Sequence, residues 1–359
     1  MRRRSFIAGA GIVAAASTFP KPAIAQGTTE LKLVMSWPKG FPGLGTAAAR
    51  FAERFETATE GRYKIRIFGA GELVHPLKCL DALQEGAADL YHSADYYYQG
   101  KLTGLSFFTT VPFGLTANEQ DAWLQFGGGQ ALWDEASAQF GVKPFPCGNT
   151  GSQMGGWFKK EMRTLDDFKG LRMRIPGFGG DVLAALGGAP STIAGSEILT
   201  ALQSGAIDAT EWVGPYNDLA FGLYKVVKHY HYPGFHEPGP TLSLGVRLAV
   251  YEKMSKGDQA ILAACALAEN NICLAEFNAN NAKALETLIT KHGVLLHEFP
   301  DEIFKAAAAA ARDILAKAAA GDPLTAKIYA SYSAFAKSVR EWSRISDKSY
   351  MQKRALDAL

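Results

Sequence analysis

The chain has 359 residues, of which 48% are hydrophobic and 20% are charged, and its formal net charge is +2 at pH 7. A chain of this length can bury the cores of two lobes, and it lacks the basic excess that nucleic-acid binding requires. Its four scattered cysteines include no CxxC or His-Cys spacing, which argues against a zinc site.

The first 25 residues have the pattern of an export signal. Adjacent arginines and a spacer precede Phe6-Ile7, an Ala- and Gly-rich apolar run follows, and Ala23-Ile24-Ala25 is a small-x-small cleavage site. We expect a twin-arginine-type signal peptide over 1–25, cleavage before Gln26 and a periplasmic location. The apolar run is shorter than the about 20 residues that a transmembrane helix needs, and no later segment predicts one.

The mature chain opens with a strand–helix–strand order. Alternating apolar residues predict strands over 31–37 and 63–68, and spaced apolar residues predict a helix over 46–59. This order favours a βαβ unit and a parallel sheet. Gly43-Leu44-Gly45 imitates a dinucleotide fingerprint, but the next strand does not end in the acid that such a site needs, so we expect no organic cofactor.

An internal similarity points to two lobes of related construction. The segment 81–90 (DALQEGAADL) resembles the segment 200–209 (TALQSGAIDA). In both, a helix ends at a glycine, which suits a left-handed residue, and a short strand begins. Because ligands bind outside the carboxyl ends of strands in such sheets, the residues that follow each copy are candidates for a ligand-binding cleft.

The predicted fold class is therefore α/β with two lobes and a long C-terminal helix. We expect lobe I over 29–150, completed by a strand returning near 239–256, and lobe II over 151–238. The remaining part, 257–359, begins with one helix over 257–292 that is either a spine across both lobes or an arm that links two protomers. Two shorter helices are expected in this part, at 304–319 and 323–342.

Polar and aromatic residues gather where the strands are predicted to end. Tyr98 and Gln99 follow the first copy, and Arg174 lies near the carboxyl end of the strand 171–175. An arginine fork can bond both oxygens of a carboxylate at once, which predicts a small organic acid as the ligand. The alternative is structural: the tyrosines pack on a lobe surface, and the glycine-rich segment 148–157 is a plain crossover.

Glu211 follows the second copy and points to a cation. In the same cleft it would repel a carboxylate ligand by roughly 4 kcal/mol at 4 Å in an effective dielectric of ~20. A cation between the two groups turns this repulsion into attraction. Glu211, the Gln153 amide oxygen and backbone carbonyls are hard oxygen ligands, which suit sodium or calcium rather than zinc.

Several motifs together carry a family resemblance that extends over nearly the whole mature chain. They are FFTTVPFG at 107–114, NTGSQMGGW at 149–157, RIPG at 174–177, EWVGP at 211–215 and FHEPGP at 235–240. The chain resembles the solute-binding proteins of tripartite ATP-independent periplasmic (TRAP) transporters, in particular those that bind 2-oxo or 2-hydroxy monocarboxylates with a metal ion. The resemblance implies a periplasmic-binding-protein-like fold and delivery of acids such as pyruvate, 2-oxobutyrate or lactate to membrane subunits.

The resemblance also implies roles for individual residues. Arg174 corresponds to the clamp on the ligand carboxylate. Gln153, Glu211 and the Trp212 backbone carbonyl correspond to the metal ligands, and Gln153 and Trp212 also line the ligand site. The ligand would complete the metal shell with carboxylate and keto or hydroxyl oxygens.

Further contacts and partners follow from the same resemblance. Tyr98 and Gln99 correspond to ligand contacts from lobe I, and Glu237 to a polar contact at the far wall. In such relatives the long late helix is exchanged between protomers, which implies a homodimer for the helix 257–292. A secreted enzyme acting on small hydroxy or oxo acids, and a sensory receptor domain, are the alternatives that the sequence leaves open.

Overall fold

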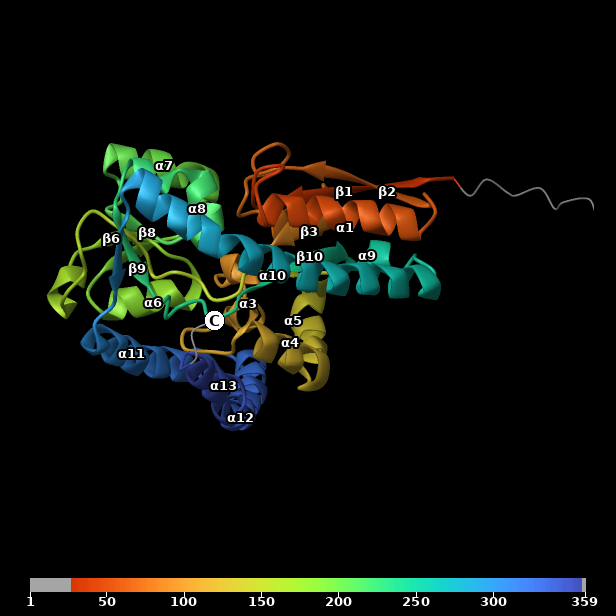
Figure 1. The fold of residues 1–359 in the computed structure, drawn as a ribbon. Helices are drawn as coiled ribbons and strands as arrows, with labels where there is room; N and C mark the ends of the chain where they lie inside the picture. Colours follow the sequence, from red (N-terminus) through yellow and green to blue (C-terminus); the bar gives the residue numbers. More distant parts are fainter. Residues whose placement is uncertain (1–26, 357–359) are drawn as a thin grey trace, which may run out of the picture.

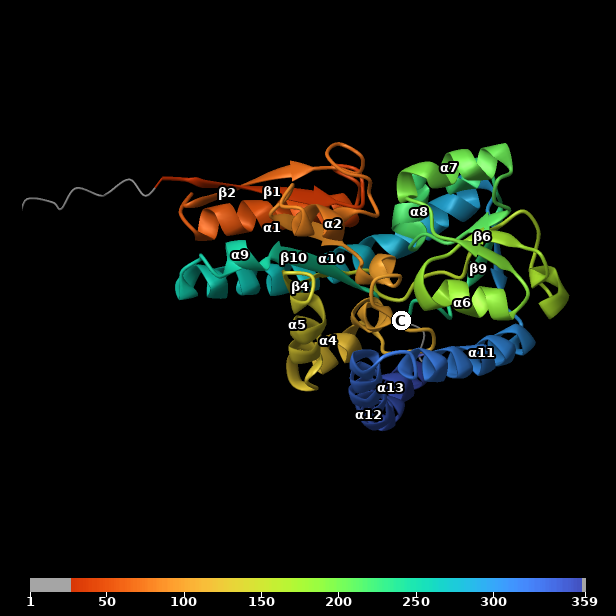
Figure 2. The same ribbon diagram turned by 180° about the vertical axis from the view of Figure 1, so that it is seen from behind.

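The computed structural model describes residues 27–356, which form two mixed β-sheets connected by helices (Figures 1 and 2). The predicted signal peptide, 1–25, lies outside the described residues. The first sheet has the strand order β2-β1-β3-β10-β4. Its strands are β1 (Thr29–Met35), β2 (Tyr63–Phe68), β3 (Leu90–Ser93), β4 (Val142–Asn149) and β10 (Thr241–Arg247). β10 runs antiparallel to both β3 and β4, so the chain returns to the first sheet after building the second.

The second sheet has the order β11-β9-β5-β8-β6-β7. Its strands are β5 (Gly156–Phe158), β6 (Arg172–Arg174), β7 (Ala189–Ser191), β8 (Ala209–Thr210), β9 (His229–Tyr232) and β11 (Leu295–Glu298). The edge strand β11 was not predicted from the sequence. It has four residues and forms by pairing in parallel with β9, so its existence depends on a contact between segments more than sixty residues apart.

Helices cover both sheets, and the shortest of them are single turns. We call the first sheet, with its helices, lobe I, and the second, with its helices, lobe II. The helices of lobe I are α1 (Leu44–Ala58), α2 (Cys79–Gln84), η1 (Asp95–Tyr98), η2 (Thr103–Leu105), α3 (Ser106–Thr109), α4 (Ala117–Phe126), α5 (Gly129–Ala138) and α9 (Leu248–Tyr251). Those of lobe II are η3 (Leu165–Phe168), α6 (Gly177–Ala185), α7 (Gly195–Ser204), α8 (Pro215–Phe221) and η4 (Leu223–Lys225). The C-terminal part adds α10 (Lys256–His292), α11 (Asp301–Ala319), α12 (Pro323–Ile345) and α13 (Asp347–Arg354).

The two similar segments of the sequence adopt the same succession of elements. α2 is followed by Gly86 (φ 75°) and β3, and α7 is followed by Gly205 (φ 72°) and β8. β3 runs parallel to β1, and β8 runs parallel to β6. A residue with a side chain is strained at such positive φ values, so glycine allows each helix to stop and the strand to begin.

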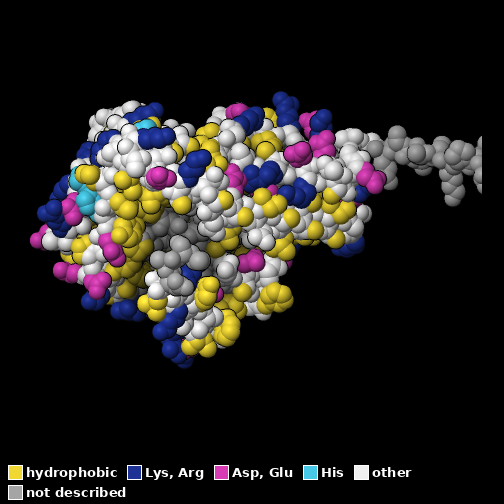
Figure 3. Space-filling model, viewed as in Figure 1, with side chains coloured by type: hydrophobic (Ala, Val, Ile, Leu, Met, Phe, Trp, Pro, Cys, Tyr) yellow, Lys and Arg dark blue, Asp and Glu magenta, His cyan; other side chains and the backbone are white. Residues whose placement is uncertain are grey.

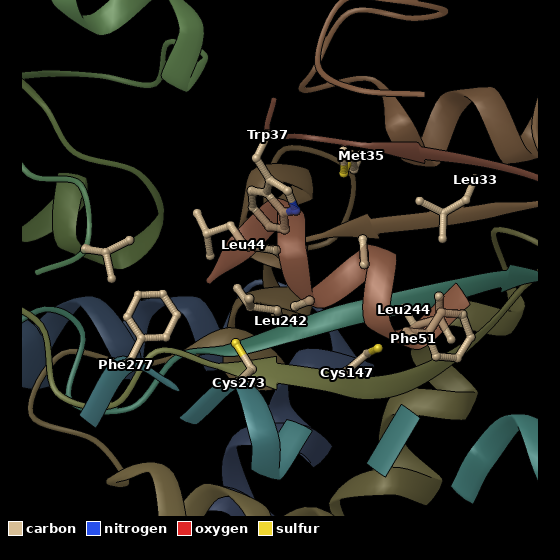
Figure 4. Packing of buried hydrophobic residues seen from close by; sticks show 14 of the residues in the cluster. Leu33, Met35, Trp37, Leu44, Phe51, Cys147, Leu242, Leu244, Cys273 and Phe277 are labelled. Carbon is tan, nitrogen blue, oxygen red and sulfur yellow. The ribbon is translucent and has the colours of Figure 1, made fainter. Parts of the chain in front are cut away.

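The long helix α10 crosses both lobes of one chain (Figure 1). It packs against α1 and β4 of lobe I and against α8 of lobe II. Figure 4 shows its Cys273 and Phe277 below Leu44 and Leu242 of lobe I, and all four side chains are buried. Ser255 caps its first turn and Gly293 (φ 63°) ends it. The interpretation as a spine is therefore correct for the contacts within one chain.

By length and composition, α10 also meets the requirement for a membrane-spanning helix, contrary to the sequence prediction. Buried side chains such as Leu262, Phe277 and Leu288 lie along this helix and pack inside the protein. A second connection between the lobes is made by α11, which packs on α6, and α12, which packs on α3, α4 and α5. Acidic and basic side chains are interspersed on the face seen in Figure 3, as the near-neutral charge implies.

Candidate functional site

Arg174 and Glu211 lie side by side at the carboxyl ends of two neighbouring strands. β6 ends at Arg174, and Glu211 comes directly after β8; the parallel register places Arg174 opposite Thr210. The Glu211 amide donates to the Arg174 carbonyl over 3.2 Å. Both side chains are 1% exposed and form an ion pair between Arg174 Nη1 and Glu211 Oε1. The two charged residues selected from the sequence therefore share one buried site.

The Arg174 guanidinium is held from several sides. Its Nε donates to the Ile193 carbonyl (3.3 Å) and its Nη2 donates to the Tyr97 hydroxyl (3.2 Å). The guanidinium carbon lies 5.2 Å from the centre of the Trp212 ring, a cation–π distance. Burial alone would lower the pKa of Arg174, but the attraction of Glu211 raises it above its ordinary value. The arginine is therefore a fixed positive charge with a defined orientation.

Three buried side-chain oxygens of residues expected in the site have no hydrogen-bond partner within residues 27–356: Gln153 Oε1, Glu211 Oε2 and Glu237 Oε2. The backbone N–H of Gln153 donates to the backbone carbonyl of Glu237 over 3.0 Å, so these two segments lie together. One donor atom from each of Glu211, His236 and Glu237 lies within 4.8 Å of the others. Burial, and then repulsion by Glu211, raise the pKa of Glu237 well above its ordinary value.

These oxygens fit a hard cation. A buried carboxylate or amide oxygen without a donor is costly, and an ion with oxygen ligands would compensate for it. Gln153 and Glu211 are two of the metal ligands expected from the sequence, and Trp212 follows Glu211 directly. His236 was not predicted. Its Nε2 lies 3.5 Å from Glu211 Oε2, and both of its ring nitrogens lack a hydrogen-bond partner in the described chain. Its position in the sequence, next to the predicted contact Glu237, was the one indication that it belongs to the site.

The structure does not bring Tyr98 to this cluster, contrary to the sequence prediction. Its hydroxyl donates to Ser93 (2.9 Å), and its ring packs against Tyr91 in the core of lobe I. η1 has three residues per turn, so consecutive side chains point about 120° apart. The neighbouring Tyr97 instead reaches Arg174, and no sequence pattern distinguishes which of the consecutive tyrosines faces the cleft.

Gln99 lies at the entrance between the lobes. Its Nε2 donates to Asp181 Oδ2 of lobe II over 2.8 Å. A cavity of about 400 Å³ opens here, and Tyr96, Tyr97 and Gln99 of lobe I line it together with Asp181 and Ser191 of lobe II. Gln99 thus joins the two lobes at the cleft, although it does not bond to Arg174 or Glu211 directly.

Trp212 and Glu237 form two walls of the cluster. The Trp212 ring packs edge-on against Phe41 of lobe I and Phe221 of lobe II, and its Nε1 is buried without a partner among the residues described. Glu237 is 2% exposed and follows the segment whose Phe235 carbonyl accepts from the Phe113 amide of lobe I. Both residues therefore lie where the two lobes meet.

The sequence matches a known protein family over most of its length. The family model described as "Bacterial extracellular solute-binding protein, family 7" (DctP) matches residues 33–322. The chain is 44% identical over 322 residues to a monocarboxylate 2-oxoacid-binding periplasmic protein of Nostoc sp. strain PCC 7120, and the match covers 89% of this chain and 87% of that protein.

Solved structures of TRAP solute-binding proteins agree with this assignment. The protein from Pseudoalteromonas atlantica T6c, with bound sodium and pyruvate, is 39% identical, with a TM-score of 0.88 over 91% of this chain and 99% of that one. The protein from Bordetella bronchiseptica RB50, a mixed-occupancy dimer with copurified calcium and picolinate, is 33% identical, with a TM-score of 0.90 over 92% and 98%. The chain therefore belongs to the DctP family of TRAP solute-binding proteins.

Proposed function

We propose that this chain is a periplasmic receptor that captures a small 2-oxo or 2-hydroxy monocarboxylate together with a sodium or calcium ion and delivers it to the membrane subunits of a TRAP transporter. One observation carries the proposal: the buried guanidinium of Arg174 lies beside a carboxylate, Glu211, whose Oε2 has no hydrogen-bond partner in the part of the chain that the structure describes. The relatives support the same class of acid, because one is named for binding 2-oxoacids and another has bound sodium and pyruvate.

The roles of the side chains follow from their chemistry. Arg174 receives the ligand carboxylate in its fork. Gln153 Oε1, Glu211 Oε2 and the Trp212 carbonyl hold the cation, and the ligand supplies the remaining oxygens. Glu237, whose raised pKa favours the protonated form, contacts the ligand from the far wall, and Tyr97, instead of Tyr98, contacts it from lobe I.

Closure of the two lobes buries the acid. The lobes that move are 29–150 with 239–256, and 151–238, and Gln99 joins them through Asp181 when the cleft is shut. In this proposal Gln99 acts at the entrance of the cleft, and its direct contact with the ligand stays a prediction. Such hinge closure around a ligand is a common device of two-lobed receptors.

The proposal also covers how the protein is exported, how it assembles, and the release of its acid without a chemical reaction. The twin-arginine pattern of 1–25 directs the folded protein to the periplasm. The protein forms a homodimer, which the dimeric relative from Bordetella supports. The receptor releases its acid unchanged, in keeping with a family of solute-binding proteins.

Calorimetry tests the proposal. Purified mature protein is titrated with pyruvate, 2-oxobutyrate and lactate, each in sodium, in calcium, and after chelation in a potassium buffer. We expect one acid per chain, tight binding only with a cation, and unaltered acid recovered afterwards. Binding that ignores the cation would contradict the proposed site, and consumption of the acid would favour a secreted enzyme acting on hydroxy or oxo acids.

A further inference from the structure

Two aspartates, one in each lobe, are buried and held by neutral donors. Asp95 and Asp218 are each 1% exposed. Asp95, at the start of η1, accepts hydrogen bonds from Trp133 Nε1 (2.7 Å), the Tyr91 hydroxyl (2.9 Å) and the Ser243 hydroxyl (2.6 Å). Burying a carboxylate is costly, and such donors compensate for the lost water.

Asp218 also accepts from one tryptophan and one tyrosine, but its third donor is a backbone amide instead of a serine hydroxyl. Its Oδ2 accepts from Trp157 Nε1 (2.9 Å) and from the Tyr230 hydroxyl (2.6 Å), whose rings stack with their centres 4.0 Å apart. Its Oδ1 accepts from the backbone amide of Val213 (3.2 Å). Asp218 therefore ties α8 to β5, to β9 and to the segment that follows Glu211.

The bond to Val213 fixes a peptide unit that belongs partly to Trp212. The Val213 N–H and the Trp212 carbonyl lie in one rigid, planar trans peptide and point in opposite directions. Because the N–H points at Asp218, the Trp212 carbonyl points away from it. The next carbonyl, that of Val213, accepts from the Met154 amide (3.1 Å), next to Gln153. The peptide units Trp212–Val213 and Val213–Gly214 are therefore both held in place.

We propose that Asp218 is a positioning residue for the cation site: it aims the Trp212 carbonyl at the ion and, through Val213 and Met154, keeps this carbonyl in register with Gln153. The inference rests on the proposed function. A carboxylate that accepts from an amide N–H also polarises the peptide and makes its carbonyl a better ligand. Groups behind metal ligands typically change metal affinity about 10- to 100-fold.

The test compares Asp218→Asn with Asp95→Asn. Both replace a buried carboxylate that accepts from one tryptophan and one tyrosine, but only Asp218 bonds to the peptide next to Trp212. The readout is the sodium concentration that half-saturates pyruvate binding, measured at pH 8 because burial raises the pKa of Asp218 to about 7. We expect this concentration to rise about tenfold or more in Asp218→Asn, with Asp95→Asn keeping the sodium requirement of the unaltered protein.

A milder pair covers the case in which the asparagine variants do not fold. Tyr230→Phe and Tyr91→Phe each remove one donor from one aspartate, and only Tyr230→Phe should raise the sodium requirement. Equal shifts in the two lobes, or no shift in Asp218→Asn and Tyr230→Phe, would overturn the inference. If the unaltered protein binds pyruvate without a cation, the proposed function itself fails, so the two failures are distinguishable.

Discussion

Replacing Arg174 by lysine separates the geometry of the clamp from its charge. Lysine keeps a positive charge beside Glu211, whereas alanine would leave a buried, unpaired carboxylate at a cost of about 3–5 kcal/mol and would confuse binding with stability. The ammonium can bond one ligand oxygen where the fork bonds two. Losing one charge-assisted hydrogen bond costs about 1.5–3 kcal/mol. We therefore expect the Kd for pyruvate to rise about 10- to 100-fold.

The assay is calorimetry with pyruvate in saturating sodium, accompanied by thermal unfolding without ligand. The matched control is Arg172→Lys. Arg172 lies two residues earlier on the same strand, but its side chain is half exposed and forms a fork with Asp208 on the outside of the sheet. Its replacement should leave the Kd unchanged. Binding by Arg174→Lys at the original Kd, or an equal loss in both variants, would show that Arg174 is not the clamp.

Further predictions test other parts of the site and the core. Gln153→Leu should raise the sodium concentration that half-saturates pyruvate binding about tenfold or more, and an unchanged sodium titration would exclude it as a cation ligand. Tyr97→Phe should weaken pyruvate binding severalfold, whereas Tyr98→Phe should cost only about 1 kcal/mol of stability; equal Kd values for the two variants would contradict this assignment. Burial lowers the pKa of His92 to about 4, and its neutral ring accepts from Trp37 Nε1 (3.0 Å). Since the unfolded chain binds the proton first, stability should fall by up to about 3 kcal/mol as pH drops from about 6.5 to 4, and urea unfolding should show a shallower pH dependence in His92→Gln.

Residues at the carboxyl ends of strands were predictable because they follow a local pattern. Arg174 ends an alternating run, and Glu211 follows a helix–glycine–strand step that occurs twice, so strand direction alone places both at one edge. The need for a cation followed from Coulomb's law once the two were placed together. The lobes and the long helix were predictable for the same reason, since periodicity over many residues is a strong signal.

The features that could not be predicted depend on the direction in which a side chain leaves a helical turn and on pairing between segments far apart in the sequence. Tyr97 and Tyr98 differ only in their position within one 3₁₀ turn, which the alternation of a strand does not describe. β11 forms because residues 295–298 find β9, and four residues carry too little pattern to indicate this. Asp218 lies in α8, where the sequence pattern does not indicate that its side chain is buried. It is buried because Trp157 and Tyr230 pack against it and donate to its carboxylate.

Under the proposed function, the ion pair at the centre of the site gives a physical reason for the acid and the cation to bind together. Arg174 and Glu211 already neutralise each other in a buried setting, so an acid that approaches the guanidinium also approaches a carboxylate. That repulsion is roughly 4 kcal/mol at 4 Å in an effective dielectric of ~20, which is comparable with the gain from the fork. A cation on Glu211 removes the repulsion and restores the charge balance. Because coupling between two ligands is reciprocal, the factor by which the cation tightens the acid is also the factor by which the acid tightens the cation. A receptor built in this way holds neither ion firmly without the other.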